Sequence, residues 1–193
     1  TGPADAYISG SFDSSLSTLS EDGDNYVRET LDWSQIEQSE GSYNWNGSVP
    51  YATLYANEKN AGLKVVAVLT GGPTYFSGDS TAFLVRWANF VQSAVNNLGG
   101  QVDAWEIGTE INTSTGMSAF LAPTTPTAKT TPDPALYAKM LIVAEKIIKS
   151  ADANDEVWMG SLVSSNASNC ATTSSSLAQK ATRASSRMRP TMW

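Results

Sequence analysis

Two acids stand four residues apart in a short apolar stretch of the chain, Trp105-Glu-Ile-Gly-Thr-Glu-Ile-Asn112. Side chains of a strand alternate between its faces, so Glu106 and Glu110 are expected on one face. A carboxylate in a buried strand is unfavourable unless it is paired or reaches water. Glu106 therefore predicts a structural ion pair, with Arg28 of an earlier strand as its cation. Glu110 ends the strand, which fits either a reactive acid at a cleft or a solvated strand-end acid.

The composition restricts acid–base chemistry to carboxylates, Lys and Tyr. The 193 residues include no histidine, which excludes Ser-His-Asp and Cys-His sites and the usual zinc and iron sites. The single cysteine, Cys170, can form no internal disulfide. The net charge of −7 argues against nucleic acid and anionic membranes as partners. Neutral substrates fit better, and we expect no metal and no other cofactor.

Apolar runs alternate with helical patterns along the chain, which is typical of βαβ units and a parallel sheet. Such a sheet places its working loops after the strands, and Thr113–Thr131 is a long loop of that kind. The predicted strands are Ala6–Ser11, Asn25–Leu31, Leu63–Thr70, Val102–Thr109 and Val157–Val163. The predicted helices are Ser14–Ser20, Val49–Asn60, Ser80–Leu98 and a fourth that follows Pro132-Asp-Pro134.

This spacing predicts an incomplete barrel. Eight units at roughly 38 residues each would need on the order of 300 residues, whereas about five strands are present. The fold class is therefore α/β, a half TIM barrel of about five parallel strands with flanking helices over residues 1–163. We expect residues 164–193 to be a Ser/Thr-rich basic tail, with a weak helix as the alternative to an irregular chain. All 19 acids precede residue 157, and the remainder carries Lys180, Arg183, Arg187 and Arg189.

Several ordered motifs over residues 20 to 163 resemble clan A retaining glycoside hydrolases, which are TIM-barrel glycosidases. The run Trp105–Glu110 resembles the fourth-strand Trp-Glu-Ile-x-Asn-Glu motif that ends in the acid/base glutamate. Val27-Arg28 with Leu31–Glu37 and Gly41–Trp45 resembles the second strand and its loop. Gly62–Tyr75 resembles the third strand with its terminal Pro-x-aromatic. The segments Tyr137–Lys149 and Val157–Gly160 resemble the fourth helix and fifth strand.

The resemblance implies a role for each matching position. Glu110 is the expected acid/base, and Arg28 the residue that orients the nucleophile's carboxylate. Trp33, Trp45 and Tyr75 are candidates for stacking on sugars, with loop packing as the alternative for each. Glu37 is expected to be a structural partner at the barrel mouth.

The sequence departs from the family pattern in two ways. Thr109 stands where the family has an Asn that binds a sugar hydroxyl, so we expect Thr109 to bind substrate more weakly. The chain also ends before the seventh strand, which carries the nucleophilic glutamate in the family, and no acid follows Glu156. A retaining mechanism needs a second carboxylate roughly 5 Å from the first, so we expect little or no activity from this chain alone.

Three interpretations remain open. The chain is a glycosidase half-site with residual or shared activity on plant-type polysaccharides or oligosaccharides, a non-catalytic carbohydrate-binding remnant, or a folding fragment. Each predicts self-association through exposed barrel edges, most simply as a homodimer. The first residue is Thr1 and not Met, so we expect that a leader was removed, either by a cell or by a cloning design. Removal by a cell would mean that the protein is secreted or extracellular.

Overall fold

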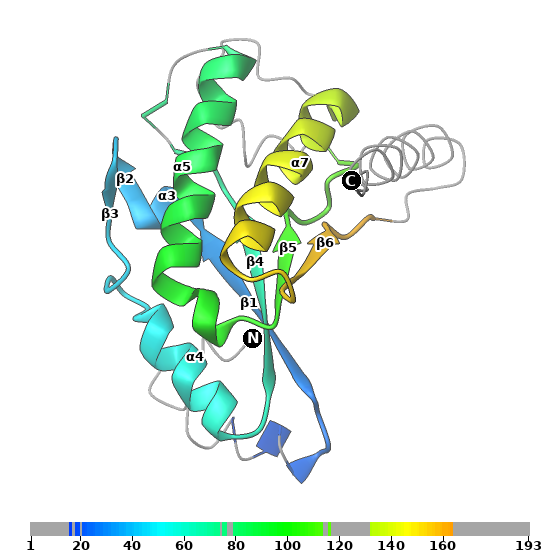
Figure 1. Ribbon diagram of the computed structural model, residues 1–193. Coiled ribbons are helices and arrows are strands. Elements are labelled where there is room, and N and C mark those ends of the chain that lie inside the picture. The colour runs from blue at the N-terminus through cyan, green and yellow to red at the C-terminus, as the bar shows by residue number, and fades with distance from the viewer. Residues whose placement is uncertain are drawn as a thin grey trace, which may run out of the picture.

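Four parallel strands in the order β1-β4-β5-β6 form the main sheet (Figure 1). They are β1 (Tyr26–Asp32), β4 (Lys64–Thr70), β5 (Ala104–Ile107) and β6 (Glu156–Met159). The computed structural model describes residues 16, 18–19, 21–73, 75–76, 79–113, 116 and 132–163. Sequential order with parallel pairing is the arrangement of consecutive βα units in a TIM barrel.

A helix connects each strand to the next. These crossovers are α4 (Tyr51–Asn60), α5 (Ser80–Leu98) and α7 (Pro134–Ala151), and the 3-10 helix η1 (Gly99–Gln101) extends α5. Asp79 and Asp133 cap α5 and α7, because each carboxylate accepts two backbone N–H groups of the first turn. Between β1 and α4 the chain also forms a short helix, α3 (Trp33–Ile36), and a hairpin of β2 (Glu37–Ser39) and β3 (Ser42–Tyr43).

The two faces of the sheet differ in what covers them. In β1, Val27, Glu29 and Leu31 are buried, while Tyr26 and Arg28 alternate with them and are exposed. The buried set faces the helices, which Figure 1 shows in front of the sheet, and α5 and α7 pack against each other there. We call the opposite face, which carries Arg28, the inner face.

The hydrophobic core lies between the sheet and the helices. Apolar residues of β4 and β5 on the helix side, such as Ala67 and Trp105, pack with aromatic side chains of α3 and α5. Trp33 is at the centre of this cluster, stacked on Phe90 at 4.9 Å between ring centroids. The largest buried side chains of the cluster are Trp33, Trp87, Trp105, Tyr55, Tyr137, Phe83 and Phe90.

The α/β fold class predicted from the sequence is confirmed, as a parallel sheet of four described strands, of which β5 and β6 end earlier than predicted. β5 ends at Ile107, not at Thr109, because Gly108 and Glu110 have φ angles of 80° and 50°, outside the strand region. The hairpin β2-β3 was not predicted. The predicted strand Ala6–Ser11, most of the predicted helix Ser14–Ser20 and the tail 164–193 lie outside the described residues.

Within the described ranges, no helix has the length and apolar character required to cross a membrane. The same residues hold no group of three or more side chains suited to bind a metal ion.

Candidate functional site at the carboxyl ends of the strands

The predicted Arg28–Glu106 ion pair is confirmed. Parallel strands bring their carboxyl ends to one edge, and Arg28 of β1 reaches across β4 to Glu106 of β5. Its Nε and Nη2 donate to the two carboxylate oxygens of Glu106 at 2.6 and 2.9 Å. This bidentate geometry is the strong form of an Arg–carboxylate ion pair.

Glu106 is the buried partner of this pair, with 8% of its side chain exposed against 47% for Arg28. Its Oε1 also accepts the backbone N–H of Ser161 at 3.0 Å. Three donors therefore compensate a carboxylate that would be unfavourable in a dry environment. The hydrogen bond to Glu106 raises the pKa of Arg28, against the opposing effect of burial.

Glu110 is exposed in the turn that follows β5. Its φ of 50° lies in the left-handed region, which is uncommon for a residue other than glycine. The backbone is held on both sides: its N–H donates to Ser161 Oγ at 3.2 Å, and its carbonyl accepts the N–H and hydroxyl of Thr113 at 2.8 and 2.9 Å. A strained conformation with this support is typical of functional sites.

Thr109 lies between the ion pair and Glu110. Its Oγ1 is 3.0 Å from Ser161 Oγ and 3.5 Å from Arg28 Nη2. The structure thus brings together three residues predicted from the sequence, Arg28, Thr109 and Glu110, with the structural acid Glu106 beside them.

Trp33 and Trp45 are not part of this cluster. Trp33 is fully buried, and Trp45 is 8% exposed and stacks on Phe90 with its Nε1 donating to Ser93 Oγ at 3.0 Å. A ring packed in the core has no free face for a sugar. Both residues therefore occupy the packing position that the sequence left open as their alternative.

Tyr75 lies near Glu37, not among the contacts of Glu110. Glu37 is 1% exposed and accepts Trp33 Nε1 at 2.5 Å and the Gly41 N–H at 2.7 Å. Burial and the neighbouring Glu37 raise the pKa values of Tyr75 and Tyr43 above the ordinary range. Glu37 therefore connects α3 with the hairpin, as expected of a structural partner.

Ser161 is the residue that the sequence analysis missed. It contacts Glu106, Thr109 and Glu110, yet a serine in a Met-Gly-Ser-Leu context carries no motif. The register could have identified it: Ile107 pairs with Met159, so the residues two positions further, Thr109 and Ser161, are neighbours.

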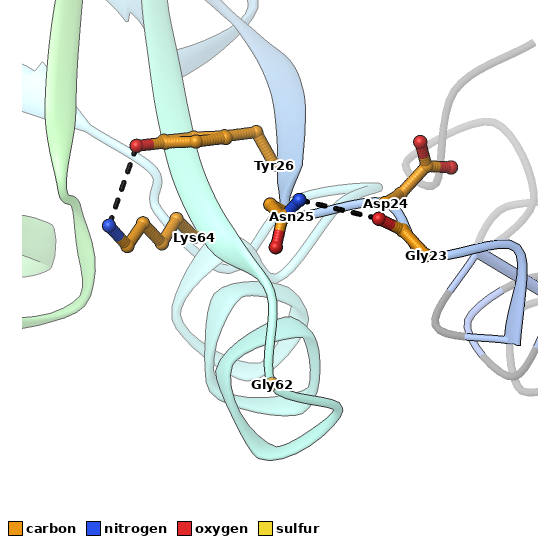
Figure 2. Close-up of a pocket in the computed structure, with 6 residues that line it drawn as sticks. All are labelled: Gly23, Asp24, Asn25, Tyr26, Gly62 and Lys64. Carbon is orange, nitrogen blue, oxygen red and sulfur yellow. Dashed lines mark hydrogen bonds between the residues drawn. The ribbon is translucent and has the colours of Figure 1, made fainter.

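A hollow of about 450 Å³ lies at the other end of the sheet (Figure 2). The side chains of Tyr26 and Lys64 run side by side there, with the Lys64 amine 3.5 Å from the Tyr26 hydroxyl. The hollow is at the amino ends of β1 and β4, away from Glu110, and is lined by Gly23, Asp24, Asn25, Tyr26, Gly62 and Lys64.

Comparison with solved structures identifies glycoside hydrolases with a similar fold. A family 39 glycoside hydrolase from Bacteroides cellulosilyticus WH2 matches 76% of this chain and 28% of its own at 20% identity and a TM-score of 0.55. An exo-β-1,4-mannosidase from Opitutaceae bacterium strain TAV5 matches 81% of this chain and 28% of its own at 16% identity and a TM-score of 0.62. A fungal β-1,4-galactanase matches 86% of this chain and 50% of its own at 18% identity and a TM-score of 0.62.

No family model matches the sequence, and no curated protein does. The chain spans between 28% and 50% of the length of the solved structures named above. Identities of this size concern the fold alone. The described part of the chain therefore has the fold of part of a TIM barrel of the kind found in these glycoside hydrolases.

Proposed function

We propose that this chain carries the acid/base half of a glycosidase site and that Glu110 is the acid/base. The observation that supports it best is the exposed carboxylate of Glu110 at the carboxyl end of β5, on a strained backbone beside the Arg28–Glu106 pair. Active sites of TIM-barrel enzymes lie at this end of the strands. The named structural neighbours are glycoside hydrolases, which favours a carbohydrate substrate.

In the proposed reaction, Glu110 donates a proton to the glycosidic oxygen as the bond to the anomeric carbon breaks. It then takes a proton from the water that attacks the same carbon. The retaining form of this reaction needs a second carboxylate roughly 5 Å away on the opposite side of the sugar. The function therefore depends on which other acids face Glu110.

The other acids described near this edge are engaged elsewhere. Glu106 is bound to Arg28 and Ser161, Asp32 accepts the N–H and hydroxyl of Ser34, and Glu37 is buried in the hairpin. Arg28 would orient a nucleophile in the family pattern, but here its carboxylate partner is Glu106. We therefore propose that the 193-residue chain alone turns over glycosides slowly or not at all.

Thr109 weakens the site further. Its one hydroxyl is within 3.0 Å of Ser161 Oγ, so part of its hydrogen-bonding capacity is used inside the protein. An Asn at this position would reach further and bring two donors and an acceptor. Contacts to a sugar hydroxyl that strengthen in the transition state are thus expected to be weaker in this chain.

Azide provides the test, because it can replace an absent nucleophile. In the proposed step an azide nitrogen bonds to the anomeric carbon, the bond to the phenol oxygen breaks, and the Glu110 proton goes to that oxygen. We expect negligible cleavage of phenyl β-glycosides without azide and formation of glycosyl azide with it. Glu110→Gln should lower the azide-dependent rate roughly 10²- to 10⁴-fold, and Glu21→Gln, at an exposed glutamate before β1, should not.

Two results would contradict this proposal. Cleavage without azide that disappears in Glu110→Gln would show that the chain is itself an active glycosidase. Absence of cleavage with azide across a panel of β-glucosides, β-mannosides, β-galactosides and β-xylosides would exclude the acid/base role. Binding of these sugars without any cleavage would support the carbohydrate-binding remnant instead.

A further inference from the structure

The segment that follows β6 is joined to the segment that follows β5 by a series of hydrogen bonds. Asn112 and Val163 exchange two of them, from the amide nitrogen to the Val163 carbonyl at 2.8 Å and from the Val163 N–H to the amide oxygen at 2.9 Å. The Tyr137 hydroxyl donates to the Ile107 carbonyl at 2.7 Å and accepts the Gly160 N–H at 2.9 Å. Ser161 lies between these two connections.

Ser161 makes four contacts, with four different residues of the β5 end. Its N–H donates to Glu106 Oε1 at 3.0 Å, and its carbonyl accepts the Ile111 N–H at 3.2 Å. Its Oγ lies 3.0 Å from Thr109 Oγ1 and accepts the Glu110 N–H at 3.2 Å. The backbone of Ser161 thus fixes the segment, and its hydroxyl reaches Glu110.

The contact to Glu110 matters because of the conformation there. Glu110 is the one residue other than glycine with a positive φ among those the structure describes. Such a conformation persists only where neighbouring groups hold it. On the carbonyl side Thr113 supplies the support, and on the N–H side the acceptor is Ser161 Oγ. Rotation of this backbone would redirect the carboxyl group.

We propose that Ser161 is a positioning residue, whose hydroxyl holds the Glu110 backbone in the left-handed conformation and so aims its carboxyl group from the carboxyl edge of the sheet. The catalytic meaning of this role rests on the proposed acid/base function of Glu110. The structural part does not, because it concerns one hydrogen bond between Ser161 and Glu110.

Amide hydrogen exchange measured by NMR on the full chain tests the structural part without any substrate. In Ser161→Ala the Glu110 N–H loses its acceptor, and we expect its exchange to become about tenfold faster, with Val66 and Val68 in β4 unchanged. Ser161→Thr keeps the hydroxyl and should restore slow exchange. Ser150→Ala is the matched control, since it removes a hydroxyl bonded to a helix carbonyl on α7.

Unchanged exchange at Glu110 in Ser161→Ala would overturn the proposal. So would equal acceleration at Glu110, Val66 and Val68, because that pattern reports general destabilisation. Failure of Ser161→Thr to restore slow exchange would also count against it, since the hydroxyl would then not be the group responsible.

Azide-assisted cleavage tests the catalytic part. A phenyl leaving group needs protonation and a dinitrophenyl group does not, so Ser161→Ala should slow cleavage of the phenyl glycoside about tenfold and leave the dinitrophenyl glycoside nearly unchanged. Equal slowing of both would contradict a positioning role. If the unmodified chain shows no azide-assisted cleavage, the proposed function fails, while the exchange measurement still decides whether Ser161 holds Glu110.

Discussion

Buried carboxylates are stabilised differently on the two faces of β1 and its neighbours. On the inner face, Glu106 has three donors. On the helix face, Glu58 of α4 is fully buried and neither of its oxygens has a hydrogen-bond partner among the described residues. Burial, together with the nearby Glu29, raises the pKa of Glu58 to about 8. The raised pKa favours the neutral form of Glu58 at pH 7, whereas Glu106 has the partners of a charged group.

The first prediction is that stability falls as the pH rises toward 8. Glu58 binds its proton more tightly when folded than when unfolded, so its contribution is complete below the ordinary pKa and is lost as the pH rises through about 8. Glu58→Gln places an uncharged side chain of similar shape at this site and should remove the decline in the free energy of unfolding. We expect that decline to be on the order of a few kcal/mol. Urea unfolding at pH 5 to 8.5 measures it.

The matched control for this experiment is Glu21→Gln, which alters an exposed glutamate. It should keep the pH dependence of the unmodified chain. A parallel decline in Glu58→Gln and in the unmodified chain would assign the effect to other acids, with Glu29 the carboxylate that acts on Glu58.

The second prediction concerns the Arg28–Glu106 pair. Arg28→Met should destabilise the protein by about 1–3 kcal/mol, because it leaves Glu106 buried without its cation. The exposure of Arg28 places the effect toward the lower value. With Glu106→Gln and the double variant, urea unfolding yields a coupling energy. If the double variant loses as much free energy of unfolding as the two single variants together, the ion pair contributes nothing to stability.

Residue types alone predicted some of these contacts and not others. Arg28 and Glu106 were predicted to pair because both are charged and lie in strands that a parallel sheet places near each other. Ser161 was missed because serine is common in loops, and only the pairing register places it near Thr109. Trp33 and Trp45 show a related difficulty: an aromatic residue after a strand fits a sugar platform and a core position equally well.

At the scale of elements, the carboxyl ends of β5 and β6 are held together by close backbone contact. A Cβ atom at Gly160 would lie 2.5 Å from the Ile107 carbonyl oxygen and 2.6 Å from that of Gly108. Real Cβ atoms do not approach backbone so closely, so only glycine allows this spacing. The position of Ser161, which follows Gly160, depends on it.

The third prediction is that Gly160→Ala separates the two strand ends. We expect a loss of about 2–4 kcal/mol in the free energy of unfolding and large NMR shift changes at Thr109 and Glu110. Gly100→Ala in η1 is the control, because a Cβ there meets nothing within 4 Å and its φ is not positive. Equal stability of the two variants would show that the ends can move apart freely.

The sequence predicted the presence of the helices and strands better than the residues at which they end. The apolar stripes of α5 and α7 predicted these helices, and in the structure Asp79 and Asp133 cap their first turns. The end of β5 depends on the conformations of Gly108 and Glu110, whose N–H groups donate to Leu69 and Ser161 of neighbouring segments. Such contacts have no local signal in the sequence.

For the whole molecule, the apolar residues at the middle of the inner face are buried. Val66, Val68 and Ala104 point to this face by register and are each no more than 3% exposed. The exposed apolar groups of the face are Tyr26 and Trp158, from the two edge strands of the described sheet, with ring centroids 6.5 Å apart. Among the described residues of this face, the apolar surface available to a partner is therefore concentrated on this ring pair.

The homodimer stays a prediction, and the ring pair gives it a specific form. Two inner faces that meet would cover Tyr26 and Trp158, and β1 and β6 are the edge strands among the residues that the structure describes. Light scattering at micromolar concentration should give twice the single-chain mass of 20.5 kDa. Replacing both Tyr26 and Trp158 by Ser should shift the species to the monomer, and Val85→Ser, at an exposed site on α5, should not.

A monodisperse species of single-chain mass would exclude the dimer. A dimer that persists in the Tyr26 and Trp158 double variant would exclude the inner face as its interface.

The hydrogen bond between Glu110 and Ser161 also bears on the order of folding. These residues are 51 positions apart in the chain, and closing a loop of that length costs conformational entropy before any contact offsets it. The helices and the β1–β4 pair involve shorter separations and can form earlier. The left-handed turn at Glu110 gains its support only after β6 has docked, so the candidate site is expected to be among the last parts of the half-barrel to become structured.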